Sequence, residues 1–261
     1  MDKFAYTKIK CYDNCPLQYD LNYIKNIWLK TETDDDVTFG FSFHDYCEAY
    51  IKAKGENEEA LFNSIKLKYK TLFSKPIGEQ LKPRFLKGRD VFHKFYNDVI
   101  KNETDCKSEA SIEYKMDDNT LLTGKLDIII KKEDGTIHII DIKSGKVSNK
   151  KLYASQLVFY AGLYAMINKI PYDKITISLF FPLDKDNEED NPSWQSMMHN
   201  IDFSHKEVHE FFLKAWNTIT EIRSPNRKKD ANVQFLCKYC SYEGYSQYCP
   251  KTAGKTPKKK I

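Results

Sequence analysis

Residues 123–145 read TGKLDIIIKKEDGTIHIIDIKSG, two isoleucine-rich segments joined by a polar turn. Each segment predicts a β-strand, and residues 133–135 predict a three-residue hairpin loop. Gly135 would supply the positive φ that the end of such a loop requires. With that loop, Asp127 lies roughly opposite Asp141 on the neighbouring strand. The pattern therefore predicts a hairpin with two carboxylates on one face.

The same alternation places a lysine beside these carboxylates. Asp141 and Lys143 are two residues apart and point the same way, whereas Ile142 points into the core. Two carboxylates among isoleucines repel each other unless a cation lies between them, and Mg²⁺ or Mn²⁺ prefers such oxygen ligands. The constellation predicts a divalent metal site. An ordinary hairpin whose charges face water would show the same pattern.

The segments around the hairpin predict an α/β fold. Apolar residues at helical spacing precede it, and short segments rich in Ile, Leu and Thr alternate with a helical pattern after it. We expect an α/β core with a helical N-terminal elaboration and a cysteine-bearing C-terminal end. The predicted helices are 4–30, 42–53, 58–73, 84–100, 153–168 and 204–223, and the predicted strands are 111–115, 121–131, 136–143, 175–181 and 194–203.

Two helical pairs lie on either side of the hairpin in the sequence. His44 and Glu48 are four residues apart on one predicted helix, and Gln156 and Tyr160 are four apart on another. Residues at this spacing share a helix face. Each pair could equally serve packing or the surface, with Tyr160 buried and Gln156 at the rim.

The C-terminal region carries a cysteine cluster. Cys237 and Cys240 are separated by two residues, a spacing from which two thiolates can grip one ion, and Cys249 follows after residues 241–248. Three ligands leave a fourth to be found. Iron–sulfur and zinc fit the same spacing, and reduced thiols without a metal remain an alternative.

Composition and charge exclude several classes of protein. With 41% hydrophobic and 30% charged residues among 261, the chain is neither collagen-like nor wholly disordered. We expect a cytoplasmic protein without a membrane segment, because no apolar stretch approaches the roughly 20 residues that span a bilayer. The net charge is +4, and a basic tail with Lys255, Lys258, Lys259 and Lys260 ends the chain. Such a tail either contacts phosphates or is simply solvated.

Six motifs in series resemble the RecB-like branch of the PD-(D/E)XK nuclease superfamily. This branch includes CRISPR-associated nucleases with an iron–sulfur cluster and the nuclease domains of RecB and AddB. The matching positions are Cys15-Pro16, Gly40 with His44, Gly124-Lys125-Leu126-Asp127, Asp141-Ile142-Lys143, Gln156 with Tyr160, and the terminal cysteines. Asp141 stands where the superfamily more often has Glu. The resemblance implies a restriction-endonuclease-like core sheet flanked by helices.

The resemblance also implies roles for individual residues. His44, Asp127, Asp141 and the backbone carbonyl of Ile142 would bind the catalytic Mg²⁺ or Mn²⁺, and Lys143 would orient or deprotonate the attacking water. Gln156 and Tyr160 would hold the DNA strand or brace the site. If a second metal binds, Glu113 or Glu48 would be candidates for an additional oxygen ligand.

In the resembling nucleases, the cysteine of the N-terminal Cys-Pro motif completes a 4Fe-4S cluster. The resemblance therefore implies that Cys15 joins Cys237, Cys240 and Cys249, with Cys11 as an alternative fourth ligand. The gap between Cys240 and Cys249 is longer than usual in that family, and a structural Zn²⁺ held by four cysteines satisfies the same spacing.

The leading functional prediction is a metal-dependent DNA exonuclease acting on single strands or DNA ends in repair, recombination or phage DNA processing. A helicase, a recombinase or a CRISPR-type protein is the expected kind of partner. Two alternatives remain: a nuclease-fold DNA-binding subunit of a helicase or integration complex, and a non-catalytic zinc protein that binds nucleic acid. We expect a single nuclease domain with a helical part (1–105), a nuclease core (106–223) and a cysteine-rich segment with the basic tail (224–261).

Overall fold

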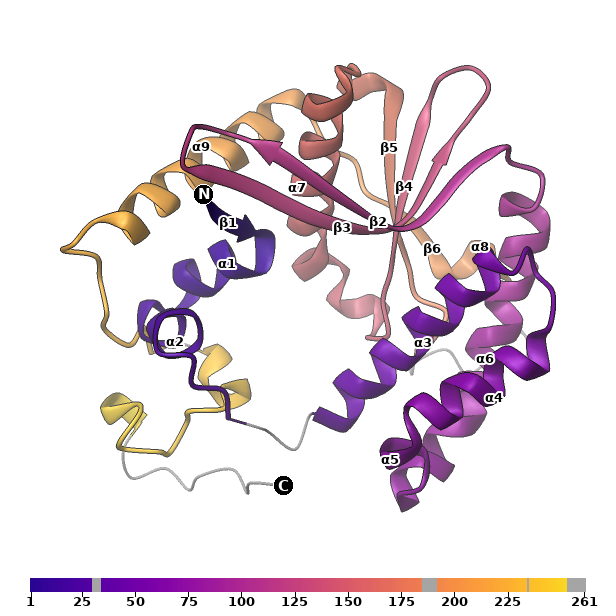
Figure 1. Ribbon diagram of the computed structural model, residues 1–261, viewed down its shortest axis with the longest axis horizontal. Coiled ribbons are helices and arrows are strands. Elements are labelled where there is room, and N and C mark those ends of the chain that lie inside the picture. The colour runs from indigo at the N-terminus through magenta and orange to yellow at the C-terminus, as the bar shows by residue number, and fades with distance from the viewer. Residues whose placement is uncertain (30–33, 185–191, 234, 253–261) are drawn as a thin grey trace. The chain divides into compact units, whose positions relative to one another are not determined.

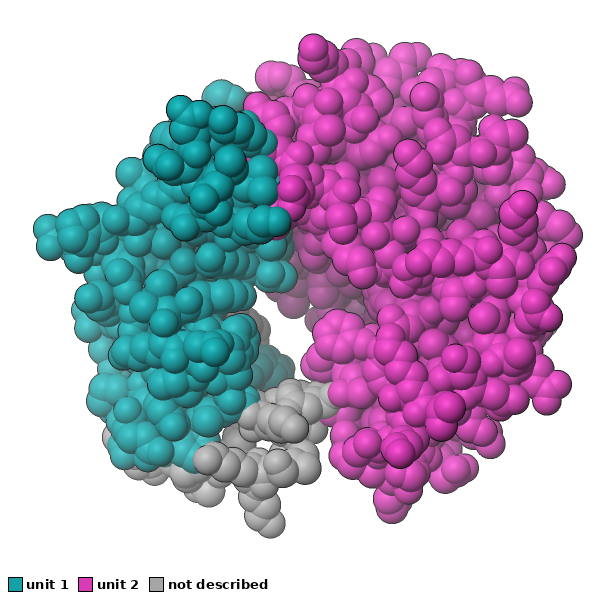
Figure 2. Space-filling view, viewed as in Figure 1, with its two compact units in different colours: residues 1–34, 115–122, 209–261 teal, residues 35–114, 123–208 magenta. Residues whose placement is uncertain are grey.

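The computed structural model describes residues 1–29, 34–184, 192–233 and 235–252. It divides into two compact units, which Figure 2 shows in different colours. Unit 1 comprises residues 1–34, 115–122 and 209–261, and unit 2 comprises residues 35–114 and 123–208. The expected basic tail, with Lys255 and Lys258 to Lys260, lies outside the described residues, as do residues 31–33 and 185–191. The prediction of a single nuclease domain, with the three parts given above, stays a prediction.

Unit 2 holds most of the helices and strands. Helices at its start are followed by three strands, a long helix and two further strands, so the predicted α/β class is confirmed. Its elements are α3 (Asp34–Lys52), α4 (Glu58–Lys68), α5 (Lys70–Phe73), α6 (Pro76–Phe95), β2 (Asp105–Lys115), β3 (Thr120–Lys131), β4 (Ile137–Ile142), α7 (Lys150–Asn168), β5 (Ile175–Phe180), α8 (Trp194–Met197) and β6 (Met198–Asn200).

The sheet has the strand order β3-β4-β5-β6, with β2 paired to β3. Strands β3 and β4 are antiparallel with Ile128 opposite Ile140, and β4 and β5 are parallel. The hairpin prediction is confirmed, because the Lys132 N–H donates to the Thr136 carbonyl at 2.9 Å and Gly135 has φ +80°. Helix α7 packs against β4 and β5 (Figure 1).

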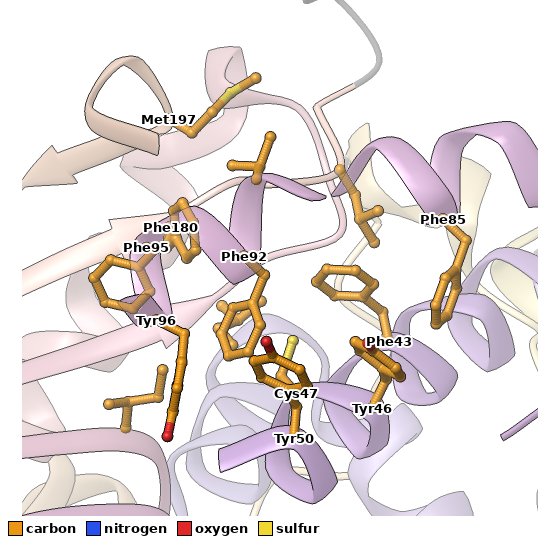
Figure 3. Close-up of a cluster of buried hydrophobic side chains, with 14 of the residues drawn as sticks. Phe43, Tyr46, Cys47, Tyr50, Phe85, Phe92, Phe95, Tyr96, Phe180 and Met197 are labelled. Atoms are coloured by element: carbon orange, nitrogen blue, oxygen red, sulfur yellow. The ribbon is translucent and has the colours of Figure 1, made fainter. Parts of the chain in front are cut away.

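An aromatic core joins the helices of unit 2 to its sheet (Figure 3). Phe43 and Tyr46 of α3 pack edge-on against Phe85 of α6, with ring centroids 5.3 and 5.6 Å apart. Phe95 of α6 packs against Phe180 of β5 at 5.0 Å. Burying aromatic side chains of this size is a large hydrophobic gain. The core therefore sets where α3 and α6 lie against the strands.

Unit 1 contains β1 (Asp2–Ala5), α1 (Tyr6–Asn14), α2 (Pro16–Tyr19) and most of α9 (His205–Arg223). Strand β1 pairs with β3, whose residues 120–122 also belong to unit 1. Helices α1 and α9 are joined by a hydrogen bond from Thr218 Oγ1 to Asp13 Oδ1 at 2.7 Å. Two short 3₁₀ turns lie in the cysteine-rich end: Phe235–Tyr239, which contains Cys237, and Pro250–Thr252, which directly follows Cys249.

Side chains at the N-terminus of α9 cap the helix. A reciprocal cap joins Ser204 and Glu207: the Ser204 N–H donates to Glu207 Oε2 at 2.8 Å, and the Glu207 N–H donates to Ser204 Oγ at 3.2 Å. Along α9, Val208, Ala215 and Ile219 are buried, whereas Trp216 is 38% exposed.

Residues 194–203 differ from the expected strand. They begin with helix α8, whose Ser193 cap accepts a hydrogen bond from the Ser196 N–H at 3.2 Å, and only Met198–Asn200 form a strand. The local cap outweighs the strand pattern over the first four residues. None of the helices in the described part of the chain combines the length and apolar character that a membrane crossing requires.

Candidate active site

Asp127 of β3 and Asp141 of β4 come from neighbouring antiparallel strands. Continuing the observed pairing of Ile128 with Ile140 by one residue sets the two aspartates opposite each other, as predicted. The backbone N–H of Ile142 donates to Asp127 Oδ2 at 2.7 Å, which fixes that carboxylate against β4. Ile140 and Ile142 belong to the aromatic core on the other face of the strand. The structure therefore brings both carboxylates together on one face.

Asp141 is a buried carboxylate with an incompletely satisfied oxygen. It is 4% exposed, and burial raises its pKa to about 6, with the charge of Asp127 adding to the rise and Lys143 opposing it. Lys143 Nζ lies 2.6 Å from Asp141 Oδ2, but within the described residues that oxygen accepts no well-directed hydrogen bond. A buried anionic oxygen in this state has lone pairs available to a cation.

His44 of α3 lies beside Asp127, with Nδ1 3.4 Å from Asp127 Oδ2. Burial by itself would raise the pKa of Asp127, but His44, Lys143 and the Ile142 N–H together lower it. Burial would likewise lower the pKa of His44, but Asp127 and Asp141 raise it. The imidazole and the carboxylates form one interacting group.

Glu109 of β2 is a site residue that sequence analysis missed. Ligand atoms of His44, Glu109 and Asp127 all lie within 4.8 Å of one another, which makes this trio a candidate metal site. Burial raises the pKa of Glu109, although it forms an ion pair with Lys125. Its φ of 51° is unusual for a strand residue and interrupts the alternation along β2. The sequence pattern carried no signal for this positive φ, and the strand predicted from the sequence began only at Ser111.

The trio includes neither Glu48 nor Glu113, which were the residues expected to supply an extra oxygen. Glu48 forms an ion pair with Lys52 at 2.5 Å along its own helix.

A hydrogen-bonded chain runs from Lys143 to helix α7. Lys143 Nζ donates to Gln156 Oε1 at 3.0 Å, and Gln156 Nε2 donates to the Tyr160 hydroxyl at 2.9 Å. Tyr160 is 8% exposed, and a Cβ on Gly124 would lie 3.0 Å from its ring, so a larger residue at position 124 would press on that ring. Lys143 Nζ also lies 4.8 Å from the centre of the Tyr153 ring. This geometry holds the ammonium beside Asp141.

The predicted cluster cysteines gather in unit 1. Cys15, Cys237, Cys240 and Cys249 line one cavity of about 60 Å³, and Cys11 is not among its lining residues. Burial raises the pKa of Cys240, and the other three lining cysteines raise it further. Cys15, near the N-terminus, therefore lines the same cavity as the three C-terminal cysteines.

The spacing of the thiols bears on which metal would fit. Among the described residues, no three cysteines have sulfur atoms that all lie within 4.8 Å of one another. Tetrahedral Zn–S bonds of 2.3 Å would hold four thiolates about 3.8 Å apart. The four thiols line one cavity, and within the described residues no three of them approach that spacing.

Comparison with known proteins places this geometry in a family. A search of curated proteins found no match. A solved structure titled "Crystal structure of SSO0001" aligns over 91% of this chain and 95% of that chain with 17% identity and a TM-score of 0.37. The model of the PD-(D/E)XK nuclease superfamily matches residues 3–250. The match spans the acidic hairpin, the lysine beside it and both cysteine-bearing segments, and the chain belongs to the PD-(D/E)XK nuclease superfamily.

Proposed function

We propose that this protein is a DNA exonuclease that acts on single strands or on DNA ends. Its superfamily implies a metal-dependent phosphodiesterase with a restriction-endonuclease-like α/β core that binds nucleic acid. The observation that carries the proposal is the buried Asp141 Oδ2, which lies beside Lys143 without a well-directed hydrogen bond and opposite Asp127. A protein retained only for binding DNA has no need of this costly arrangement.

His44, Glu109, Asp127, Asp141 and the carbonyl of Ile142 are the proposed metal ligands. The donor set fits a divalent ion, since carboxylate and carbonyl oxygens suit Mg²⁺ and Mn²⁺, and the imidazole favours Mn²⁺ of the two. When bound, the ion would lower the pKa of a coordinated water and offset charge on the phosphate.

The other residues act on the water and the phosphate. Lys143 donates to the attacking water or to the scissile phosphate, and its ammonium is held for this by Gln156. Gln156 is in turn oriented by Tyr160. The low exposure of Tyr160 favours a bracing role for this pair over direct contact with the DNA strand.

We expect linear single-stranded DNA to be degraded with Mn²⁺ or Mg²⁺ and to survive with chelator. The assay compares end-labelled linear strands, closed single-stranded circles, duplexes and RNA of matched sequence. An exonuclease shortens the linear strand and spares the circle. If none of the DNA substrates is degraded with either metal, the proposed function is wrong. Cutting of circles would remove the exonuclease assignment, and equal loss of RNA would remove the DNA preference.

We also propose that Cys15, Cys237, Cys240 and Cys249 hold a 4Fe-4S cluster. The arrangement of four cysteines round one cavity supports this over a zinc ion. Anaerobically purified protein should absorb broadly in the visible region and contain about four iron and four sulfide per chain. Cys249→Ser should lose both, whereas Cys106→Ser, outside the cavity, should keep them. A colourless protein that contains one zinc per chain would show that the cysteines hold a structural Zn²⁺ and not an iron–sulfur cluster.

The proposed cellular setting is cytoplasmic DNA repair, recombination or phage DNA processing, with a helicase, recombinase or CRISPR-type partner. A role as a non-catalytic subunit of such a complex is the second candidate. The assembled Asp127, Asp141 and Lys143 weigh against it.

A further inference from the structure

Arg84 of α6 lies at the loops that follow the two central parallel strands. Its Nε donates to the Leu183 carbonyl at 2.8 Å, after β5, and its Nη2 donates to the Ser144 carbonyl, after β4. Ser144 directly follows Lys143 in the chain. One guanidinium therefore ties together the two loops at the carboxyl ends of β4 and β5. We propose that Arg84 is a positioning residue that holds Lys143 in register with Asp141; this rests on the proposed function.

The side chain of Arg84 also contacts the helix that carries His44. Its guanidinium carbon lies 5.1 Å from the centre of the Phe39 ring on α3. The next residue, Gly40, approaches the same loop so closely that a Cβ there would lie 2.7 Å from Ser144 Oγ. Phe43 and Phe85 pack the two helices together beside this point (Figure 3). Arg84 thus connects α3, α6 and the loop after β4.

The position of the Lys143 ammonium depends on that loop. The Lys143 N–H donates to the Phe180 carbonyl at 2.7 Å, but Ser144 and Gly145 then leave the strand. A displacement of about 1 Å in a catalytic group can cost roughly a hundredfold in rate. Among the described residues, the hydrogen bonds of Arg84 go to Leu183 and Ser144 and not to His44, Glu109, Asp127 or Asp141. Because Arg84 hydrogen-bonds the loop next to Lys143 and meets α3 only at the Phe39 ring, we expect its effect on catalysis to pass through Lys143 and not through metal binding.

Arginine is suited to this task because its planar fork donates in two directions at once, whereas lysine offers a point charge. Arg84→Met keeps most of the apolar stem and loses both hydrogen bonds. Arg84→Lys keeps the charge and one donor, and should lie between wild type and Arg84→Met.

The test is a double-mutant cycle with Lys143→Met, measured under single-turnover conditions with excess enzyme on single-stranded DNA. Arg84→Met should lower the rate about ten- to a hundredfold in wild type and less than about twofold in the Lys143→Met background. The substrate KM and the Mn²⁺ affinity should stay unchanged. Arg89→Met is the matched control, because Arg89 lies on the same helix but pairs with Asp90 and Glu58.

A second measurement does not depend on activity. Reaction of the Lys143 amine with acetic anhydride, followed by mass spectrometry, should accelerate several-fold in Arg84→Met and not in Arg89→Met. Lys75, which pairs with Asp35 at 2.8 Å, is the internal reference and should not change.

The outcomes separate this inference from the proposed function. Equal rate losses in both backgrounds, a parallel loss of Mn²⁺ affinity, or unchanged labelling of Lys143 would overturn the role of Arg84. A wild-type protein that degrades no DNA would overturn the proposed function, and the labelling experiment would still decide whether Arg84 holds Lys143.

Discussion

Asp141→Asn is expected to abolish hydrolysis while making the metal-free protein more stable at pH 7. The substitution keeps the size of the side chain and removes the anionic oxygen proposed to bind the metal. We expect a loss of at least about a thousandfold in kcat, equivalent to about 4 kcal/mol of transition-state stabilisation. Mn²⁺ affinity should fall with it, as measured by titration calorimetry.

The stability gain follows from the raised pKa of Asp141. Burial raises that pKa from 3.8 to about 6 in the folded protein, so ionisation of Asp141 opposes folding. At pH 7 this ionisation lowers the free energy of unfolding by roughly 3 kcal/mol, at 1.36 kcal/mol for each pKa unit. This destabilisation is fully present above pH 6, declines as the pH falls, and is absent below about pH 4. Urea denaturation with chelator should show Asp141→Asn to be more stable by this margin at pH 7 and equal to wild type at pH 4.

Asp134→Asn is the matched control on the same hairpin. Its carboxylate lies in the exposed turn and accepts hydrogen bonds from Thr136, which lower its pKa. Its replacement should leave hydrolysis unchanged. If Asp141→Asn and wild type degrade DNA at equal rates, the assignment of the site is wrong.

Lys143→Met is expected to separate catalysis from metal binding. We expect kcat to fall by about 10²–10⁴, the range for a group that transfers or donates a proton in the transition state. Mn²⁺ affinity should hold or rise, because the Lys143 ammonium lies 2.6 Å from Asp141 and competes with a cation for that carboxylate. Single-turnover kinetics and calorimetry on the same preparation measure the two quantities.

Lys131→Met serves as its control, since Lys131 lies at the exposed end of β3. A fall in Mn²⁺ affinity in step with kcat would indicate that Lys143 maintains the site's structure and does not act on the substrate.

The hairpin could be predicted because its determinants are local. Gly135 sets the turn, and the alternation of side chains then puts Asp127 and Asp141 on one face whatever surrounds them. Glu109 could not be predicted in this way, because its positive φ breaks the alternation on which such a prediction depends. The strand prediction for residues 194–197 was wrong for a related reason. It followed the apolar pattern alone, whereas the cap at Ser193 starts a helix there.

The sequence by itself determined the α/β class, the acidic hairpin and the group of residues that resemblance singled out. Tertiary structure decided which of these meet. His44 reaches Asp127 because α3 packs through Phe43 and Phe85 onto α6, and Gln156 reaches Lys143 because α7 covers β4 and β5. The contacts of Arg84 with two loops likewise exist only in the folded chain. Turn chemistry and strand alternation act over a few residues, whereas helix placement depends on burial between segments far apart in the chain.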